Sequence, residues 1–364
     1  METRIVFHID FDYFYAQCEE VRSPELKTKP VCVCVFSDRG GDSGAIATAN
    51  YTARKYGVKS GIPIAFAKKR LEERKDAVFL PVDFEYYTEM SEKAMELMKK
   101  DVDVFEYVGR DEAYLDVTKR VEGDFKKASH LAQQIKNSIR DKIKLSCSVG
   151  ISQNKLISKI ASNYQKPDGL TIVTPEKVEE FLEQLKIRTI PGIGGKTEKI
   201  FSEMNIETIQ DLKKLDVFTL NNKFGRKSGT YIYNAARGID NEPVKEKEDR
   251  IQYSKIMTLK KDSKDYSFLS ESIKELCVEV HDVIKKNNRM FKSVGIHFVQ
   301  SDLSNKSKSR MLRNPTADLQ ELQKNAEALL VEALENQTIT IRRLGVKVTE
   351  LSEIKGQSDI TNYF

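Results

Sequence analysis

The feature that most restricts the fold of this chain is a charged stretch without apolar periodicity, residues 238–253 (GIDNEPVKEKEDRIQY). It contains Pro243, and its composition is typical of a linker between folded units. Strand-like and helix-like apolar runs occur on both sides of it. We therefore predict an α+β protein of two to three domains, which agrees with a length of 364 residues.

Apolar periodicity places the elements on each side of this linker. Before it, the pattern predicts strands over 4–10, 31–36, 102–108 and 113–118, a helix-like stretch over 10–21, and helices over 45–56, 131–139 and 178–185. Residues 190–238 are predicted as short helices broken by glycine. After the linker, the pattern predicts strands over 254–259, 293–299, 308–312 and 338–348, and helices over 269–283 and 319–330.

Composition excludes several classes of protein. Sixty Lys and Arg against 55 Asp and Glu give a net charge of +5, which permits a polyanionic partner without requiring one. The five cysteines include no CxxC pair, which argues against a disulfide framework or a structural zinc site and fits a reducing cytosol. No apolar run approaches the roughly 18 residues of a membrane span. The apolar N-terminal stretch contains acids, so it is not a signal peptide.

Three acids lie at predicted strand ends. Asp10 ends the first strand, and Asp111 and Glu112 follow the turn that contains Gly109. Acids gathered at adjacent strand ends can hold two divalent cations about 3.5–4 Å apart for phosphoryl transfer. Neighbouring strand residues point to opposite faces, so both Asp111 and Glu112 reach one metal pair only if the turn twists the chain. For any single acid, a solvated turn residue is the simpler interpretation.

Five segments carry a resemblance that extends from about Ile5 to Phe364. They are DFDYFYAQCEE, ATANYTARKYGVKSGIPI, DEAYLDVT, SCSVGIS and NYQKPDGL. In order and spacing they resemble the Y-family DNA polymerases, and in particular the archaeal DNA polymerase IV (DinB-type) branch. The resemblance implies an α+β right-hand polymerase with a palm at 1–13 and 82–173 (a ferredoxin-like βαββαβ core), small fingers at 14–81, a helical thumb at 174–237, a linker at 238–253, a separate α/β little finger at 254–354 and a clamp-binding tail at 355–364.

The resemblance also implies roles for the acids. Asp10 and Asp111 would bind two Mg²⁺ ions, with Mn²⁺ able to substitute, the main-chain carbonyl of Phe11 would assist, and Glu112 would complete the site as the catalytic residue. The chain departs from the family just before the acid pair. The family commonly has Ser and then an apolar residue there, and this chain has Gly109 and Arg110. Arg110 could pair with an acid and weaken metal binding, contact a DNA phosphate, or point into solvent.

A nucleotide pocket follows from the same resemblance. Tyr15 would stack under the deoxyribose and exclude a 2′-OH by steric overlap. Tyr51 and Arg54 lie three residues apart, so on a helix they share a face and can grip a triphosphate. The other implied nucleotide contacts are Phe14, Lys166, and the small residues Gly44 and Ala45, which would roof the base pair and leave room for damaged bases. Taken alone, Tyr15 would be an ordinary core aromatic, and Arg54 or Lys166 a solvated charge.

Two regions resemble the DNA-holding parts of the family. The segment 190–197 (IPGIGGKT) resembles a helix-hairpin-helix element, whose glycines let backbone N–H groups approach a phosphate. The residues expected to contact DNA there are Gly192, Gly194, Gly195 and Lys196, and a looser glycine turn lies at 224–229. In the C-terminal region they are Lys306, Lys308, Arg310, Arg313, Arg342 and Arg343. Because residues 251–354 are only mildly basic, solvated charges remain an alternative for this second set.

The last eight residues, QSDITNYF, resemble a box that binds a PCNA-type sliding clamp. Gln357, Ile360, Tyr363 and Phe364 would provide its anchors. The alternative is a tail that packs on its own domain. The form resembles archaeal or eukaryotic clamp ligands, and no long nuclear extension is present, so we expect an archaeal cytosol and association with the nucleoid.

Together these features predict an error-prone, template-directed DNA polymerase. It would be a monomer without membrane contact that adds dNTPs to the 3′-OH of a primer–template, bypasses lesions, and lacks proofreading because no segment remains for an exonuclease domain. One alternative is a clamp-tethered, non-catalytic DNA-binding protein whose metal site is impaired by Arg110. A nucleotidyl cyclase could share a palm-like site, but it would not explain the hairpin at 190–197 or the clamp tail.

Overall fold

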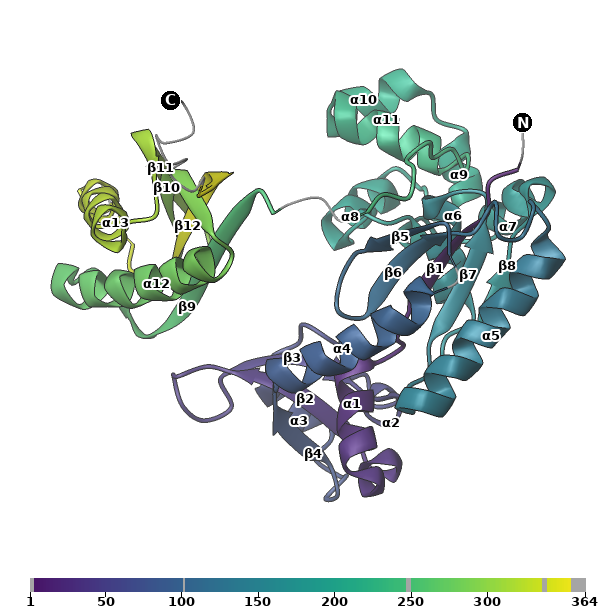
Figure 1. Ribbon diagram of the computed structural model, residues 1–364, viewed down its shortest axis with the longest axis horizontal. Helices are drawn as coiled ribbons and strands as arrows, with labels where there is room; N and C mark the ends of the chain where they lie inside the picture. The colour runs from purple at the N-terminus through teal and green to yellow at the C-terminus, as the bar shows by residue number, and fades with distance from the viewer. Residues whose placement is uncertain (1–2, 101, 247–249, 336–338, 355–364) are drawn as a thin grey trace, which may run out of the picture. The chain divides into compact units, whose positions relative to one another are not determined.

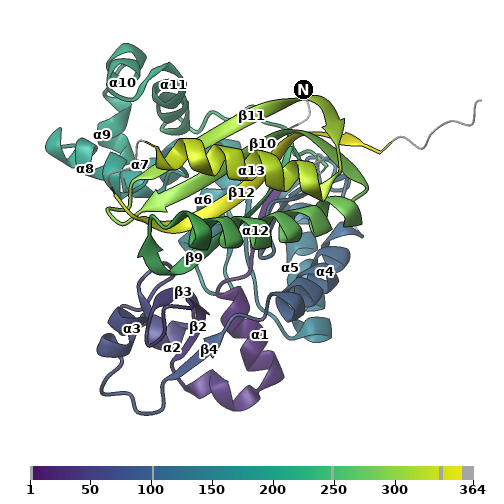
Figure 2. The ribbon, with the colours of Figure 1, turned by 90° about the vertical axis from the view of Figure 1, so that its left-hand side faces the viewer.

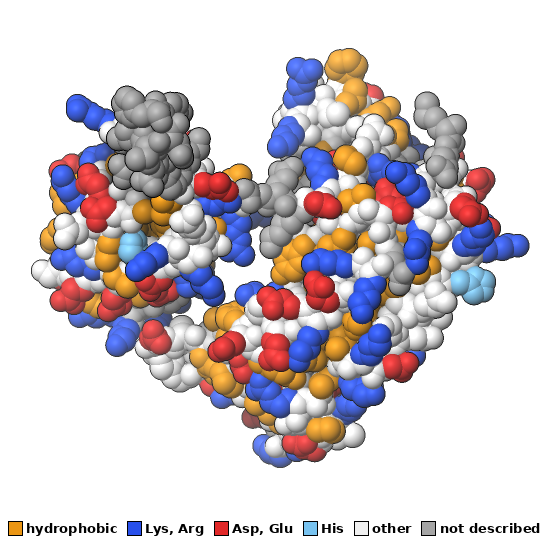
Figure 3. Space-filling view, in the orientation of Figure 1, with side chains coloured by type: hydrophobic (Ala, Val, Ile, Leu, Met, Phe, Trp, Pro, Cys, Tyr) orange, Lys and Arg blue, Asp and Glu red, His pale blue; other side chains and the backbone are white. Residues whose placement is uncertain are grey.

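The computed structural model describes residues 3–354, except 101, 247–249 and 336–338. Spatial proximity divides the chain into two units. The first comprises the described residues within 1–35, 45–62 and 66–248, and the second those within 36–44, 63–65 and 249–364. Basic and acidic side chains are interspersed on the visible face of each unit, as the small net charge leads one to expect (Figure 3). No helix of the described residues is long and apolar enough to cross a membrane.

A five-stranded sheet forms the centre of the first unit (Figure 1). Its elements are β1 (Val6–Asp10), α4 (Phe84–Lys99), β5 (Val104–Tyr107), β6 (Glu112–Asp116), α5 (Phe125–Ile143), β7 (Ser148–Ser152), α6 (Lys155–Tyr164) and β8 (Leu170–Ile172). The strand order is β5-β6-β1-β7-β8. Strand β1 is antiparallel to both neighbours, whereas β7 and β8 are parallel. The predicted strands at 4–10, 102–108 and 113–118 are therefore confirmed within a few residues.

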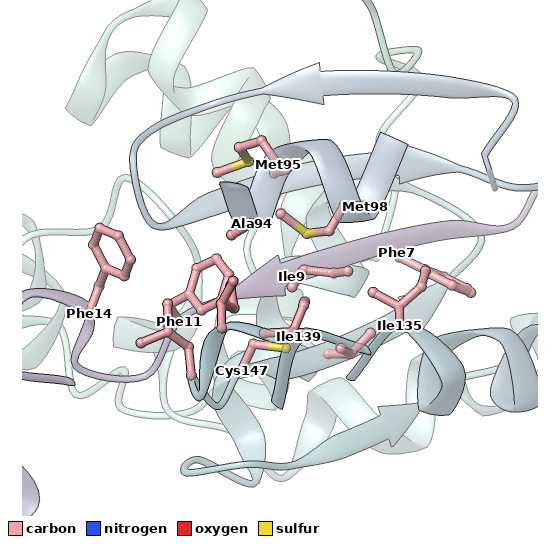
Figure 4. Close-up of a cluster of buried hydrophobic side chains, with 14 of the residues drawn as sticks. Phe7, Ile9, Phe11, Phe14, Ala94, Met95, Met98, Ile135, Ile139 and Cys147 are labelled. Atoms are coloured by element: carbon pink, nitrogen blue, oxygen red, sulfur yellow. The ribbon is translucent and has the colours of Figure 1, made fainter. Parts of the chain in front are cut away.

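The two faces of β1 have different surroundings because successive side chains of a strand point to opposite faces. Phe7 and Ile9 are fully buried and belong to the same core cluster as Met98 of α4 and Ile139 of α5 (Figure 4). His8 faces the other way, because its Nδ1 lies 2.7 Å from Ser162 Oγ of α6. Two helices thus seal one face, and polar residues between the sheet and α6 line the other.

A smaller three-stranded sheet follows β1 in sequence, with the order β3-β2-β4. This region contains α1 (Phe14–Arg22), the 3₁₀ turn η1 (Pro24–Thr28), β2 (Val31–Phe36), β3 (Gly44–Ala49), α2 (Tyr51–Arg54), α3 (Ile64–Arg70) and β4 (Val78–Pro81). The predicted helix over 45–56 was wrong in its first half. Alanine-rich Gly44–Ala49 has local helix propensity, but pairing beside β2 buries Ile46 and Ala49 and overrides that propensity. The helix begins only after Asn50, whose side chain accepts a 3.0 Å hydrogen bond from Ala53 N.

Short helices complete the first unit, as the glycine-broken pattern predicted. They are η2 (Pro175–Lys177), α7 (Val178–Glu183), η3 (Ile187–Thr189), α8 (Gly195–Glu203), α9 (Ile209–Lys213), α10 (Val217–Phe224) and α11 (Arg226–Ala235). Their core includes Phe201, Leu212 and Leu220, which are fully buried. The following segment is held against the five-stranded sheet: Val244 packs with Val6 of β1 and Tyr114 of β6. Part of the predicted linker is therefore anchored to the first unit.

Residues 250–354 form a four-stranded antiparallel sheet with two helices on one face (Figure 2). The elements are β9 (Gln252–Ser263), α12 (Tyr266–Lys286), β10 (Arg289–Gln300), β11 (Asn305–Thr316), α13 (Leu319–Leu334) and β12 (Ile341–Glu353), with the strand order β11-β10-β12-β9. Ile296 and Val346 of the sheet share a core with Ile273 of α12 and Leu330 of α13. Both helices of residues 250–354 pack on this one face, so among the described residues of this unit no helix lies on the other face of the sheet.

Candidate active site

The three predicted metal-binding acids converge at one end of the five-stranded sheet. Asp10 ends β1 and lies directly opposite Glu112, which begins β6. The backbone N–H of Phe11 donates a 2.8 Å hydrogen bond to the carbonyl of Asp111, which places these two residues side by side. The N–H of Gly109 donates a 3.2 Å hydrogen bond to the carbonyl of Glu112, so the turn is tight. The sequence requires a change of direction at this turn for both acids to serve one site, and their joint binding of one metal pair stays a prediction.

Lysine side chains neutralise two of these acids. Lys166 Nζ forms an ion pair with Asp10, and Lys159 Nζ of α6 forms one with Glu112. His8 Nε2 also lies 3.2 Å from Glu112 Oε2. The predicted phosphate ligand Lys166 is thus in direct contact with a predicted metal ligand.

The surroundings shift the pKa values of the acids in opposite directions. Burial raises the pKa of Asp10, although Lys166 opposes this effect. The hydrogen bond with His8, followed by the interaction with Lys159, lowers the pKa of Glu112 to about 2 despite its burial. Burial and the neighbouring Glu112 raise the pKa of Asp111. Burial also lowers the pKa of His8. Carboxyl groups whose ionised form is penalised by burial are stabilised in that form by a bound cation.

The donor set suits hard divalent cations. Asp10, Asp111 and Glu112 offer carboxylate oxygens, and Phe11 offers a carbonyl beside them, which is the ligand type that Mg²⁺ prefers. Within the described residues, no three His, Cys, Asp or Glu side chains lie close enough to hold an ion together. The ammonium groups of Lys159 and Lys166 supply the positive charge next to Glu112 and Asp10. The types of donor atom therefore suit a divalent cation, and an ion bound by these carboxylates would compete with the two lysines.

The loop that carries Lys166 is fixed from two sides. Lys136 of α5 is almost fully buried, and its Nζ donates hydrogen bonds of 2.7, 2.8 and 2.9 Å to the carbonyls of Cys147, Asp168 and Gly169. From the other side, the N–H of Asp168 donates a 2.9 Å hydrogen bond to Asp12 Oδ2. These contacts hold the loop beside the end of β1.

The predicted sugar gate, Tyr15, lies on α1 and is half-buried. Its ring stacks on that of Tyr87 of α4, with centroids 4.6 Å apart and an interplanar angle of 17°. The Tyr87 hydroxyl in turn donates a 2.6 Å hydrogen bond to Glu19 Oε1. Phe14, by contrast, has a side chain that is only 2% exposed, so only its backbone can contact a nucleotide.

Tyr51 and Arg54 lie together, as their spacing predicted. The Arg54 guanidinium carbon is 4.8 Å from the centre of the Tyr51 ring. Arg54 Nε also donates a 2.9 Å hydrogen bond to the carbonyl of Ala49, and Nη2 one of 3.2 Å to that of Asp12. Arg54 thereby connects α2 to the residues that follow β1. Gly44 and Ala45, the predicted roof, begin β3 rather than a helix.

Arg110 contacts α4 and pairs with neither of the acids that follow it. Its Nε donates a 3.0 Å hydrogen bond to Thr88 Oγ1, and its guanidinium carbon lies 5.2 Å from the centre of the Phe84 ring. The side chain is half-buried against α4 rather than solvated. Among the contacts of the described residues, neither Asp111 nor Glu112 is a partner of Arg110.

The segments of the chain that match known protein families divide near the boundary between the two structural units. Residues 9–163 match the impB/mucB/samB family, residues 250–361 match the C-terminal domain of that family, and residues 188–240 match the thumb domain of DNA polymerase-iota. DNA polymerase IV of Nitrosopumilus maritimus is 80% identical over 364 residues and is covered fully, as is this chain. DNA polymerase IV of Methanosarcina acetivorans is 40% identical over 369 residues, again with full coverage of both chains. The chain belongs to the Y-family DNA polymerases of the DNA polymerase IV type.

Solved structures agree with this assignment. A Y-family DNA polymerase chimera of Dbh and Dpo4 superposes with a TM-score of 0.88 at 35% identity, covering 96% of this chain and 99% of that one. An insertion ternary complex of Dbh DNA polymerase gives a TM-score of 0.69 at 35% identity, with the same coverage. The polymerase fold class and the assignment as a DNA-directed DNA polymerase are therefore confirmed. The domain boundaries and the roles of single residues stay predictions.

In the thumb of this Y-family polymerase, the predicted hairpin exposes its glycines. Gly192 adopts a positive φ of 87°, and Gly194 caps the N-terminus of α8. Gly192, Gly194, Gly195 and Lys196 are all exposed, whereas Ile193 between them is buried. Backbone N–H groups at the start of α8 are thus accessible to an anion.

In the little finger, the basic run on β11 faces the helices. Lys306, Lys308 and Arg310 lie opposite Phe298, Ile296 and Val294 of β10, so they share the face that packs on α12 and α13. Arg310 forms an ion pair with Glu332 of α13, and Lys308 Nζ lies 3.8 Å from Glu332 Oε2. The register of β11 against β10 thus turns these side chains toward the helices, and their expected contact with DNA stays a prediction.

The open face of the sheet carries a different set of residues. His297, Gly345 and Ser307 lie side by side across three strands, and Lys347 lies opposite Gly295. A Cβ on Gly345 would lie 2.1 Å from His297 Cε1, and one on Gly295 would lie 2.7 Å from Lys347 Cε. Both glycines therefore leave room for a long side chain to lie flat across the neighbouring strand. Arg343, one of the predicted DNA contacts, lies on this face opposite Thr258.

Sequence reasoning missed four residues that organise the palm: His8, Asp12, Lys136 and Lys159. Two signals could have indicated them. His8 is a polar residue within an apolar strand, and Lys159 and Ser162 are spaced to share one face of α6. The predicted clamp-binding residues Gln357, Ile360, Tyr363 and Phe364 lie outside the described residues.

Proposed function

We propose that this protein extends a primer 3′-OH with deoxynucleotides opposite a DNA template, with low fidelity and across damaged bases. The observation that carries the proposal is the convergence of Asp10, Asp111 and Glu112 at one end of the palm sheet, with Lys166 in contact with Asp10. Two similar structures are ternary complexes of Dbh DNA polymerase, which supports binding of primer–template DNA and a dNTP.

The roles proposed for the palm residues follow from their positions. Asp10, Asp111, Glu112 and the carbonyl of Phe11 would hold two Mg²⁺ ions, which would activate the 3′-OH and neutralise charge on the transferring phosphate. Lys166 and Arg54 would bind the triphosphate, since both are cationic groups placed next to the strand end that carries Asp10. Because Lys166 pairs with Asp10, binding of the triphosphate by Lys166 would exchange this ion pair for contacts with phosphate.

Tyr15 would exclude ribonucleotides, because its stacking on Tyr87 fixes the position of the ring. The C-terminal residues would tether the protein to a PCNA-type clamp, and the protein would act as a monomer in an archaeal cytosol. We also propose that the protein synthesises DNA without proofreading.

The alternative of a non-catalytic DNA-binding protein required Arg110 to impair the metal site. The observed contacts of Arg110 with Thr88 and Phe84 direct its charge to α4, which disfavours this alternative. A non-catalytic DNA-binding protein would also not require the Tyr15 ring to be held in a fixed position by Tyr87.

Primer extension on undamaged and abasic templates with Mg²⁺, comparing wild type with Asp10→Ala, tests the proposal. We expect template-directed extension on both templates by wild type and its loss in Asp10→Ala, with the DNA dissociation constant unchanged within about twofold because the thumb and little finger are intact. Salt-sensitive DNA binding without any extension by the wild type would overturn the proposal and favour the non-catalytic alternative.

A further inference from the structure

Arg110 is the residue at which this chain departs from the common family pattern, and its side chain is held at two points on α4. Its Nε donates a 3.0 Å hydrogen bond to Thr88 Oγ1. The Thr88 hydroxyl in turn donates a 2.7 Å hydrogen bond to the carbonyl of Phe84, one helical turn earlier. The guanidinium also lies over the Phe84 ring, 5.2 Å from its centre. One arginine therefore restrains both the backbone and the ring of Phe84.

Phe84 connects this arginine to the predicted sugar gate. Its ring meets that of Tyr15 edge to face, with centroids 6.1 Å apart and an interplanar angle of 80°. On its other side, Tyr15 stacks on Tyr87, which Glu19 fixes through a hydrogen bond. The Tyr15 ring is thus confined between one buried aromatic ring and one that is 44% exposed. The exposed ring, Phe84, is the one that Arg110 covers.

We propose that Arg110 is a positioning residue for ribonucleotide exclusion, acting through Phe84 on Tyr15. This inference rests on the proposed role of Tyr15 as the sugar gate. A steric gate discriminates by overlap of a few tenths of an ångström, so it works only as well as its ring is held in place. Without Arg110, Phe84 loses a hydrogen-bonded brace and a cation on its exposed face, and the Tyr15 ring gains freedom to yield to a 2′-OH.

The inference also explains how an arginine can directly precede two metal-binding acids. Arg110 and Asp111 are neighbours in the turn, and binding of Arg110 to α4 directs the positive charge to Thr88 and Phe84. The same contact ties the turn that carries Asp111 to the helix that supports the gate. A substitution that only disturbed the metal-binding acids would lower the use of dNTP and rNTP together. A substitution that releases the gate would change their ratio.

The test measures kcat/KM for a dNTP and for the matching rNTP in wild type and in Arg110→Leu, which keeps apolar bulk on Phe84. We expect the selectivity for dNTP to fall by about tenfold, the combined effect of one hydrogen bond and one cation–π contact, through a gain in rNTP use. Use of dNTP should stay within about twofold. Thr88→Val should produce a smaller change of the same sign, and Arg110→Lys should restore part of the selectivity.

A binding readout separates this effect from the rate of chemistry. With a dideoxy-terminated primer, the dissociation constant of the rNTP from the ternary complex should fall in Arg110→Leu, while that of the dNTP stays unchanged. Arg74→Leu is a matched control, since Arg74 also lies over an aromatic ring, 5.5 Å from the centre of Tyr56, and bonds a neighbouring side chain, Asp76, within the fingers. Its selectivity should equal that of wild type. Thermal melting of each variant checks that the fold is retained.

Tyr15→Ala distinguishes failure of this inference from failure of the gate itself. If Tyr15→Ala abolishes selectivity while Arg110→Leu and Thr88→Val leave it unchanged, the role of Arg110 is overturned and the gate stands. If Arg110→Leu lowers dNTP and rNTP use equally, the residue serves the metal-binding turn and the inference is also overturned. If Tyr15→Ala leaves selectivity unchanged, the gate assignment fails and the inference fails with it.

Discussion

The end of the palm sheet that carries the acids and the open face of the little-finger sheet both present residues proposed to meet nucleic acid. The two regions differ in whether their charged side chains are paired and partly buried or exposed. In the palm, Asp10 and Glu112 are partly buried and each forms an ion pair with a lysine. On the little finger, Lys347 lies across a glycine on a face that no helix covers. Paired, partly buried charges depend on exact geometry, whereas exposed charges act through salt-dependent attraction. We therefore expect single substitutions in the palm to reduce the reaction rate strongly and those in the little finger to weaken DNA binding modestly.

The largest effect should come from Glu112→Gln, which removes a charge but keeps the shape of the side chain. We expect kcat to fall by at least about 10²-fold, the scale seen when one group that stabilises a transition state is lost, without weaker DNA binding. Glu106→Gln is the matched control, because Glu106 of β5 also pairs with a lysine of α6, Lys155, at 2.7 Å. Single-turnover extension measures the rate of both variants. Equal losses of rate would contradict a special role of Glu112, because any glutamate–lysine pair of the palm would then have the same effect.

A smaller but still large effect should follow Lys136→Met. This substitution removes the ammonium donor from the carbonyls of Asp168 and Gly169 and loosens the loop that carries Lys166, although Gly169 keeps a 3.0 Å hydrogen bond from Val149 N. A misplacement of about 1 Å can cost about 10²-fold in rate, so we expect a loss of that order in kcat/KM for dNTP. Arg140→Gln removes an exposed partner of Asp168, at 2.6 Å, and should change the rate less than about twofold. A loss in Arg140→Gln as large as that in Lys136→Met would contradict the special role of the buried lysine.

Single substitutions in the little finger should cause modest changes in DNA binding. We expect Lys347→Gln to weaken duplex binding at low salt and to reduce the slope of log K against log [salt] by about 0.9, the value for one phosphate contact. Lys308→Gln changes the same charge on the same sheet, but Lys308 faces the helices and lies near Glu332. Its slope should match that of wild type. If Lys308→Gln altered the slope more than Lys347→Gln, the assignment of the two faces would be reversed.

The smallest effect should be a pH dependence of DNA binding that arises from His297. Burial, with a contribution from Lys347, lowers the pKa of His297 in the free protein, so the imidazole is neutral at pH 7. Nearby phosphates would raise this pKa in the complex, so binding takes up a proton. Affinity should therefore rise as pH falls through the pKa of the complex and level off below that of the free protein. The gain should be less than about tenfold, the effect of one pKa unit. Equal gains in His297→Gln and wild type, from fluorescence anisotropy titrations at several pH values, would refute this role.

Much of the palm could be predicted from sequence because its strands and turns are indicated by residues that lie close together along the chain. The strand ending at Asp10 and the hairpin around Gly109 follow from apolar alternation and turn residues over a few positions. The segment 44–49 could not be predicted in this way. Its alanines favour a helix locally, and only pairing with the preceding strand β2 makes it a strand. The direction of Arg110 was likewise left open, because Phe84 and Thr88 lie more than twenty residues before it.

The amino-acid sequence by itself determined the family, and it predicted the order of the domains and the acids of the proposed metal site, because these depend on residue type and spacing along the chain. Tertiary structure decided which charges meet. It placed Lys159 and His8 on Glu112, turned Lys308 and Arg310 toward α13, and directed Arg110 to the ring beside Tyr15. Such contacts depend on strand register and helix packing between segments far apart in sequence, and a one-residue change of register would move every side chain of a strand to the other face.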